Sequence, residues 1–161
     1  MIVFRPTPGF VYSHPAHLVA FGFGAGLARY APGTFGSLAA WPFGWLLGLA
    51  HPTILFLTVF LLFLLGVWAC AVTGQHLGVH DHGAMVWDEF VAFLLVAAIL
   101  PREPGWQAAG FVLFRAFDIG KPPPIRWLER RYQGGFGVMV DDLAAAGYTL
   151  MVLALARKLF F

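Results

Sequence analysis

Long apolar runs alternate along this chain with shorter stretches rich in glycine, proline and charge. The longest run, at 52–72, contains no charged side chain. An α-helix rises about 1.5 Å per residue, so about 20 apolar residues cross the hydrocarbon core of a bilayer. The pattern therefore predicts a membrane-spanning helix over 53–73.

The remaining apolar segments are shorter, and they occupy residues 16–28, 37–50, 86–100, 106–118 and 142–160. The first is glycine-rich and below spanning length, so we expect it to lie at the membrane interface or to re-enter. Segments 86–100 and 106–118 suit partial or tilted spans, or a buried hairpin, as well as full crossings. We predict an all-α, polytopic membrane helical bundle with short or re-entrant helices, folded as a single domain over 1–161.

Composition supports a membrane protein and excludes other classes. The chain is 60% hydrophobic and 11% charged, and its mean hydropathy is +0.76. A soluble domain is roughly half apolar and about 25% charged. The net charge of +2 is small, and no basic stripe with interleaved aromatic residues occurs, so we expect no nucleic-acid partner.

Alternating the crossings from 37–50 onward places every long polar, glycine-rich stretch on one side of the membrane. Seven basic residues lie on that side: Arg5, Arg29, Arg115, Lys121, Arg126, Arg130 and Arg131. The opposite side has three: Arg102, Arg157 and Lys158. Because cytoplasmic loops are enriched in Lys and Arg, we expect the glycine-rich loops, and any chemistry they carry, to face the cytoplasm.

Pairs of adjacent acids border two of the apolar segments. Asp88 and Glu89 lie at the start of 86–100, and Asp141 and Asp142 at the start of 142–160. One acid per helix could be a cap, because a helix N-terminus carries unpaired N–H groups and partial positive charge. Adjacent helical residues point about 100° apart, however, so the second acid of each pair would face a neighbouring helix.

A fifth acid, Asp118, ends segment 106–118 at the same predicted depth. Carboxylates at membrane depth are rare unless they serve a functional site. Five of them gathered at one boundary would repel strongly, and a hard divalent cation such as Mg²⁺ takes oxygen ligands. We therefore predict Mg²⁺ as cofactor, and the candidate metal ligands are Asp88, Glu89, Asp118, Asp141 and Asp142.

Basic residues near Asp118 suggest an anionic substrate. Arg115 lies three residues before Asp118 on the same helix face, where a simple intrahelical ion pair is the alternative explanation. Lys121 and Arg126 follow in the adjoining loop. We treat these three cations as candidate ligands of a substrate phosphate, and Arg130 and Arg131 as a consequence of the positive-inside bias.

Two glycine-rich turns could complete a phosphate site. The first, "PGTFGS" at 32–37, contains Gly33 and Thr34, with Ser37 as the expected N-cap of the next helix. The second, "GGFG" at 134–137, supplies Gly134 and Gly135. Turns of this kind that lead into helix N-termini place backbone N–H groups around an anion, although glycine is also common in ordinary turns.

Several other chemistries are excluded by missing motifs. Cys70 has no arginine six positions later, so a cysteine-phosphatase loop is absent. Neither a GxSxG elbow nor a Walker A sequence occurs. His80 and His82 have a spacing that can bind zinc or copper, but no cysteine or other nearby histidine completes a ligand set, so we interpret them as interfacial residues.

Four motifs together resemble phosphatidylglycerophosphatase A of bacteria: "PGTFGSLAA", "GVHDHGAMVWDEF", "FRAFDIGKPPPIRW" and "GGFGVMVDDLAAAG". The resemblance runs from about residue 16 to residue 150. It implies a Mg²⁺-dependent lipid phosphatase that converts phosphatidylglycerophosphate to phosphatidylglycerol at the cytoplasmic face of the inner membrane, in phospholipid biosynthesis. Oligomeric state and acyl-chain preference stay open.

The residues and the resemblance together define candidate roles. Expected participants in catalysis are Asp88, Asp118, Asp142, Lys121 and Thr34. One carboxylate would activate water or act as the nucleophile, and the sequence does not choose between these. A cation transporter would instead place acids mid-span in repeated halves. A CDP-alcohol phosphotransferase would need an Asp-Gly pair leading to Ala-Arg, which is absent.

Overall fold

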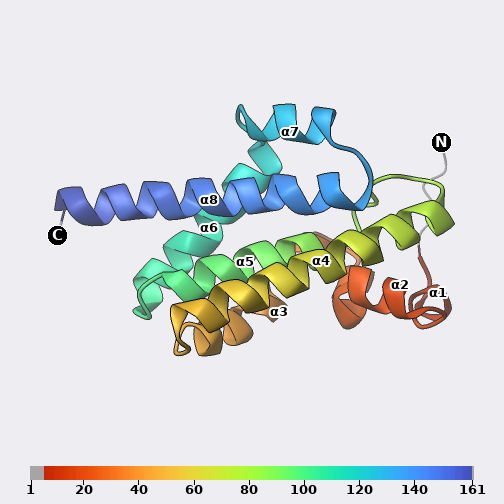
Figure 1. The fold of residues 1–161 in the computed structure, drawn as a ribbon, viewed down its shortest axis with the longest axis horizontal. Helices are drawn as coiled ribbons and strands as arrows, with labels where there is room; N and C mark the ends of the chain where they lie inside the picture. The colour runs from red at the N-terminus through yellow and green to blue at the C-terminus, as the bar shows by residue number, and fades with distance from the viewer. Residues whose placement is uncertain (1–5, 161) are drawn as a thin grey trace.

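The fold is a bundle of helices, two of them much longer than the others (Figure 1). The computed structural model describes residues 6–160, and this part of the chain contains no strand. Its helices are α1 (Pro8–Val11), α2 (Pro15–Ala20), the 3₁₀ helix η1 (Gly22–Leu27), α3 (Pro32–Leu47), α4 (Pro52–Leu77), α5 (Trp87–Ile99), α6 (Pro104–Gly120), α7 (Ile125–Arg131) and α8 (Gly134–Phe160). Arg5, one of the basic residues used to predict orientation, lies outside the described residues.

Proline marks the start of most of these helices. It stands in the first turn of α1, α2, α3, α4 and α6, where its missing N–H costs nothing and its fixed φ suits the helix. At the other end of α4, Gly78 adopts the left-handed conformation with a φ of 70°, which is the usual way to terminate a helix.

The two long helices are long and apolar enough to cross a membrane. They are α4 and, in α8, residues 134–159. The outward surface of α4 is formed by exposed large hydrophobic side chains: Ile54, Phe56, Leu57, Phe60, Leu61, Leu64, Leu65 and Trp68. A soluble monomer rarely exposes so large an apolar surface. The helix predicted over 53–73 is confirmed, with four more residues at its C-terminal end.

Successive long elements run in opposite directions. Close approaches at glycine show that α4 and α8 are antiparallel, since Gly66 meets Met139 while Gly135 meets Val67 and Ala71. Glycine contacts also show that α3 and α5 are parallel, since Gly36 meets Val86 and Gly44 meets Leu94. Figure 1 shows both helices running in the direction of α8, as the alternation of crossings used in the prediction requires.

Helix α5 is the centre of the bundle and contacts α3, α4, α6 and α8. Phe93 of α5 and Phe114 of α6 are fully buried in the bundle, and Trp41 of α3 stacks on Phe111 of α6. Between helices in a bilayer such side chains stabilise the bundle through close van der Waals packing and not through removal from water, so this aromatic core holds α5 in place. Its first turn, with Asp88 and Glu89, is consequently fixed in the middle of the protein.

Several boundaries differ from those predicted. The stretch 32–37 is the first part of α3 and not a loop, and Ser37 lies inside this helix, where its hydroxyl donates to the carbonyl oxygen of Gly33 at 3.0 Å. Ser37 is therefore not an N-cap. Segment 16–28 is broken into α2 and η1, with positive φ at Phe23 and Gly24 inside the latter. Helix α7 was not expected.

Helix α8 begins at Gly134, eight residues before the predicted start of 142–160. The glycine-rich "GGFG" stretch thus forms its first turn, and no acid lies in that turn. Asp141 and Asp142 cannot be N-terminal caps, because the unpaired N–H groups of a helix are confined to its first four residues. Asp88 and Glu89 do lie in the first turn of α5, as predicted.

Candidate active site

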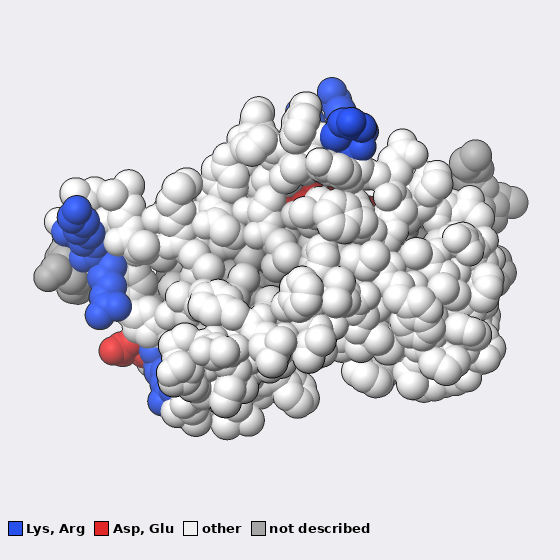
Figure 2. Space-filling view, in the orientation of Figure 1, with Lys and Arg blue, Asp and Glu red and all other residues white. Residues whose placement is uncertain are grey.

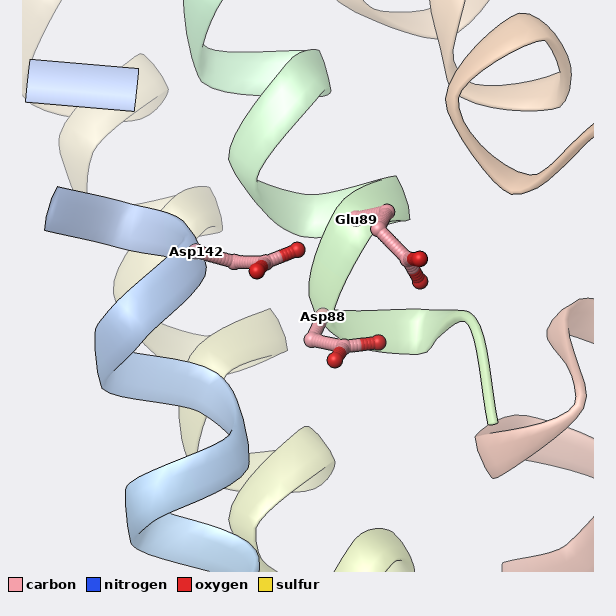
Figure 3. Close-up of side chains that lie close together, drawn as sticks. All are labelled: Asp88, Glu89 and Asp142. Carbon is pink, nitrogen blue, oxygen red and sulfur yellow. The ribbon is translucent and has the colours of Figure 1, made fainter. Parts of the chain in front are cut away.

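Three carboxylates from two helices meet in the interior. Asp88 and Glu89 come from the first turn of α5, and Asp142 reaches toward them from α8 (Figure 3). One oxygen from each lies within 4.8 Å of the others. Asp88 is 8% and Asp142 3% exposed. We call these residues the acidic triad; sequence analysis had placed all of them in one site.

Each member of the acidic triad has a buried oxygen without a hydrogen-bond partner among the described residues: Oδ1 of Asp88, Oε2 of Glu89 and Oδ2 of Asp142. Burying an unpaired carboxylate oxygen is costly, so such atoms usually have a ligand. Hard divalent cations take carboxylate oxygens as ligands. The donor set therefore fits a cation such as Mg²⁺, with these three residues as the ligands that the fold brings together.

Arg115 of α6 lies beside the acidic triad. Its Nη1 is 2.6 Å from Oδ2 of Asp118 and 3.5 Å from Oε1 of Glu89. The intrahelical ion pair anticipated from the spacing of Arg115 and Asp118 is thus present, and the Arg115 guanidinium also contacts Glu89 of α5. Asp118 therefore borders the acidic triad, because the same Nη1 of Arg115 lies next to its carboxylate and to that of Glu89. Nε of Arg115 is buried and has no partner in the described structure.

Lys121 caps the C-terminus of α6 in a left-handed conformation, with a φ of 42°. Its Nζ lies 2.7 Å from Oδ2 of Asp141 and 2.8 Å from Oε1 of Glu129. Burial alone would lower the pKa of Lys121, but hydrogen bonds and attraction from Asp141 and Glu129 outweigh this and raise it above its ordinary value. Lys121 is therefore a fixed cation and not a proton acceptor.

The predicted phosphate-binding glycines fall into two different surroundings. Gly33, in the first turn of α3, lies so close to Glu89 and Arg115 that a Cβ would overlap the Glu89 carboxylate. Thr34 follows it in the same turn. This places the N-terminus of α3, with its partial positive charge, against the acidic triad.

The glycines of α8 lie elsewhere. A Cβ on Gly135 would overlap the backbone of α4, so its contact is with that helix. Gly134 lines a cavity of about 90 Å³ that it shares with Asp81, Glu129 and Asp141. Arg126 is exposed on α7, where its Nη2 donates to the carbonyl oxygen of Gly120 at 3.5 Å.

Two acids near the site were not identified from the sequence. Glu129, which pairs with Lys121, belongs to the charged run "ERR" and did not stand out as a site residue. Asp81, flanked by histidines, lines the same cavity as Glu129 and Asp141. A helix drawn over 125–131 would have suggested Glu129, because it places this residue on the side of α7 that carries buried Ile125.

Comparison with known proteins identifies the family. A model of the family described as phosphatidylglycerophosphatase A matches residues 18–157. A phosphatidylglycerophosphatase A of Escherichia coli is 48% identical over 83% of this chain and 78% of the relative. That of Haemophilus influenzae is 47% identical over 87% of each.

A third relative, from Bacteroides thetaiotaomicron, is provisionally named a phosphatidylinositol-3-phosphatase and is 36% identical over 87% of this chain and 92% of its own. No solved structure matches. The resemblance drawn from four sequence motifs is confirmed, and the chain belongs to the phosphatidylglycerophosphatase A family.

Proposed function

We propose that this chain is a Mg²⁺-dependent phosphatidylglycerophosphatase whose reaction takes place at the acidic triad. The phosphatase activity and the lipid substrate come from the names of its relatives. The metal rests on one structural observation, namely three buried carboxylates within 4.8 Å of one another, each with an unpartnered oxygen. Five site carboxylates against the two cations Arg115 and Lys121 leave excess negative charge that a divalent cation would offset.

The reaction exchanges one P–O bond for another. The bond from phosphorus to the terminal glycerol oxygen breaks, a bond from phosphorus to a water oxygen forms, and the glycerol oxygen takes up a proton. Asp88, Glu89 and Asp142 would hold the cation, which when bound polarises the phosphoryl group and offsets its charge. Asp118 borders these residues and is the candidate to accept the proton of the attacking water. Alternatively, it would attack phosphorus as the glycerol oxygen leaves, and water would then cleave the resulting P–O bond to Asp118 and release phosphate.

Arg115 and Lys121 supply fixed positive charge for the phosphoryl oxygens. Arg115 is already oriented by Asp118 and Glu89, and its buried Nε remains available to donate to an oxygen of the substrate. Lys121 is oriented by buried Asp141, while its second partner, Glu129, is 44% exposed and can be displaced by an incoming anion. Preoriented donors of this kind stabilise the charge of the phosphoryl-transfer transition state.

We further propose that the protein is a polytopic component of the bacterial inner membrane with its site facing the cytoplasm. The two long apolar helices support the membrane location, and the basic-residue bias supports the orientation. Cysteine introduced at exposed Gln133 should react with an impermeant thiol reagent only after the inner leaflet is opened. Labelling of intact cells would contradict the proposed orientation; buried Cys70 should not contribute.

Phosphate release by purified protein in nanodiscs tests the function. We expect turnover of phosphatidylglycerophosphate with Mg²⁺, loss of turnover in EDTA and recovery on adding Mg²⁺ back. Phosphatidylinositol 3-phosphate and glucose 6-phosphate serve as comparison substrates, the first because of the name of the third relative. Equal rates on glucose 6-phosphate would contradict a dedicated lipid enzyme, and full activity in EDTA would contradict the metal.

A further inference from the structure

Helix α7 has exposed basic side chains on one side and its buried side chain, Ile125, on the other. Successive helical residues are about 100° apart, so Arg126, Trp127, Arg130 and Arg131 fall within an arc of about 140°. All four are exposed, and Trp127 is 58% exposed. We call these four residues the basic face of α7. Only positive charge and one aromatic ring are presented there.

The opposite side of α7 fixes the helix to the protein. Ile125 is 1% exposed, and α7 packs along α8. Glu129, the one acid of the helix, is turned toward Lys121, which it contacts at 2.8 Å. The turn before the helix is tied down as well, because the Tyr148 hydroxyl donates to the carbonyl oxygen of Pro123 at 3.1 Å. The basic face is thus held outward in a fixed orientation.

The basic face lies near the level at which the exposed hydrophobic residues of α4 stop. Figure 2 shows Lys and Arg gathered over α7 and again at the end that carries the C-terminus, with an uncharged band between them. On α4 the exposed large hydrophobic residues stop at Trp68. That level is near the acidic triad, because Gly66 meets Met139, one turn from Asp142.

Exposed aromatic rings lie beside Arg131. Its guanidinium is 5.9 Å from the centroid of the Tyr132 ring, and Phe136 packs edge-on against Tyr132; these two residues are 40% and 44% exposed. Arginine beside aromatic residues is typical of segments that lie in the headgroup region, where the rings enter the acyl boundary and the guanidinium groups meet phosphates. Arginine with exposed aromatic rings could also bind a nucleic acid, because bases stack on such rings; the lipid is favoured here because an uncharged band of the surface adjoins the basic face.

We propose that the basic face of α7 binds the headgroups of anionic phospholipids in the leaflet next to the site. It would concentrate negatively charged lipid within reach of the acidic triad, in addition to fixing the depth of α7. Each Lys or Arg near an anionic surface strengthens attraction roughly fivefold. The interaction can be tested apart from the reaction through Arg130 and Arg131, because these two residues, unlike Arg126, are not candidate ligands of the substrate phosphate.

The test measures lipid binding without turnover. A fluorescent donor is placed at Gln133→Cys in a Cys70→Ala background, and acyl-labelled phosphatidylglycerol is titrated into phosphatidylcholine nanodiscs. Energy transfer gives the mole fraction of anionic lipid at half-saturation. We expect Arg130→Gln/Arg131→Gln to raise this fraction roughly 25-fold, or beyond the measurable range. Salt at 0.5 M, where the screening length is about 4 Å, should also raise the fraction for the unmodified protein.

The chain offers a matched control. Arg157 and Lys158 are also adjacent, exposed and in the last turn of a helix, but at the other end of the bundle. Arg157→Gln/Lys158→Gln should leave the half-saturation point unchanged. The same small change in both double variants, or no change in either, would overturn the proposal.

Two further measurements keep the result unambiguous. Thermal unfolding must show that the Arg130/Arg131 variant is folded, which we expect because both side chains are exposed. In phosphate-release assays the variant should need more substrate per unit of lipid surface for half-maximal rate, with the same maximal rate. Binding of an RNA oligonucleotide or poly-glutamate that the variant loses, with its lipid titration unchanged, would assign the basic face to another partner.

Discussion

Replacing Asp88 or Asp142 with asparagine should have opposite effects on stability and on activity. The two changes keep side-chain size and remove one negative charge from the acidic triad. At the outer limit of 4.8 Å between oxygens, and with an effective dielectric constant of about 20, each pair of carboxylates repels by about 3.5 kcal/mol. Arg115, 3.5 Å from Glu89, offsets part of this. We therefore expect each variant to be more stable than the unmodified protein without metal, by ~1–3 kcal/mol.

The measurement is thermal unfolding of purified protein in EDTA and in saturating Mg²⁺. For a chain of this length ~1–3 kcal/mol corresponds to roughly 3–10 °C. Mg²⁺ at a hundredfold excess over its dissociation constant should stabilise the unmodified protein by about 2.7 kcal/mol and the variants by much less. Turnover at saturating Mg²⁺ should fall on the order of a hundredfold, as for a lost transition-state contact worth ~3 kcal/mol.

A control must remove an acid that lies away from the site. Glu103 is exposed at the start of α6 and makes no side-chain cap hydrogen bond, so Glu103→Gln should change neither the unfolding temperature nor turnover. The reasoning fails if Asp88→Asn and Asp142→Asn are no more stable in EDTA, still respond to Mg²⁺ and retain turnover. The acids would then be buried structural groups and not metal ligands.

Two further predictions concern residues around the acidic triad. Gly33→Ala should lower the affinity for Mg²⁺ and the turnover by tenfold or more, because the added Cβ would displace the Glu89 carboxylate. Gly147→Ala, with no atom near the added Cβ, should leave both unchanged. Equal activity of the two variants would show that Glu89 tolerates displacement. Lys121→Met should raise KM for the lipid substrate about tenfold or more. Glu129→Gln, which removes the exposed partner of the same lysine, should leave KM unchanged or lower it. A higher KM for Glu129→Gln would mean that this ion pair is needed to orient Lys121.

The long apolar helix could be predicted because its signal needs no context. Residues 53–73 are uncharged, and any such stretch is helical in a bilayer. Helix starts were harder to predict, since "PGTFGS" and "GGFG" have turn compositions. In the structure both are helical, because Pro32 suits a first turn and because Gly66 and Gly135 let α8 approach α4 closely. Such contacts are tertiary and cannot be read from local composition.

The site was predictable as a set of residues but not as a geometry. Sequence reasoning gathered Asp88, Glu89, Asp118, Asp141 and Asp142 into one group of equivalent acids. The structure divides that group by partner: two in α5 and one in α8 face each other, one pairs with an arginine and one with a lysine. The division depends on where α6 ends and where α7 begins, which no spacing within the acids themselves reveals.

Adjacent acids are explained by this division of partners. Neighbours on a helix point about 100° apart, so a pair can serve two different groups at the same depth. In α8, Asp142 turns into the acidic triad while Asp141 turns to Lys121 at 2.7 Å. In α5, Asp88 faces the interior while Glu89 also reaches Arg115. Each pair thus joins the predicted metal ligands to a fixed cation, and two rigid helices would set the distance between a metal held there and the cations proposed to bind phosphate.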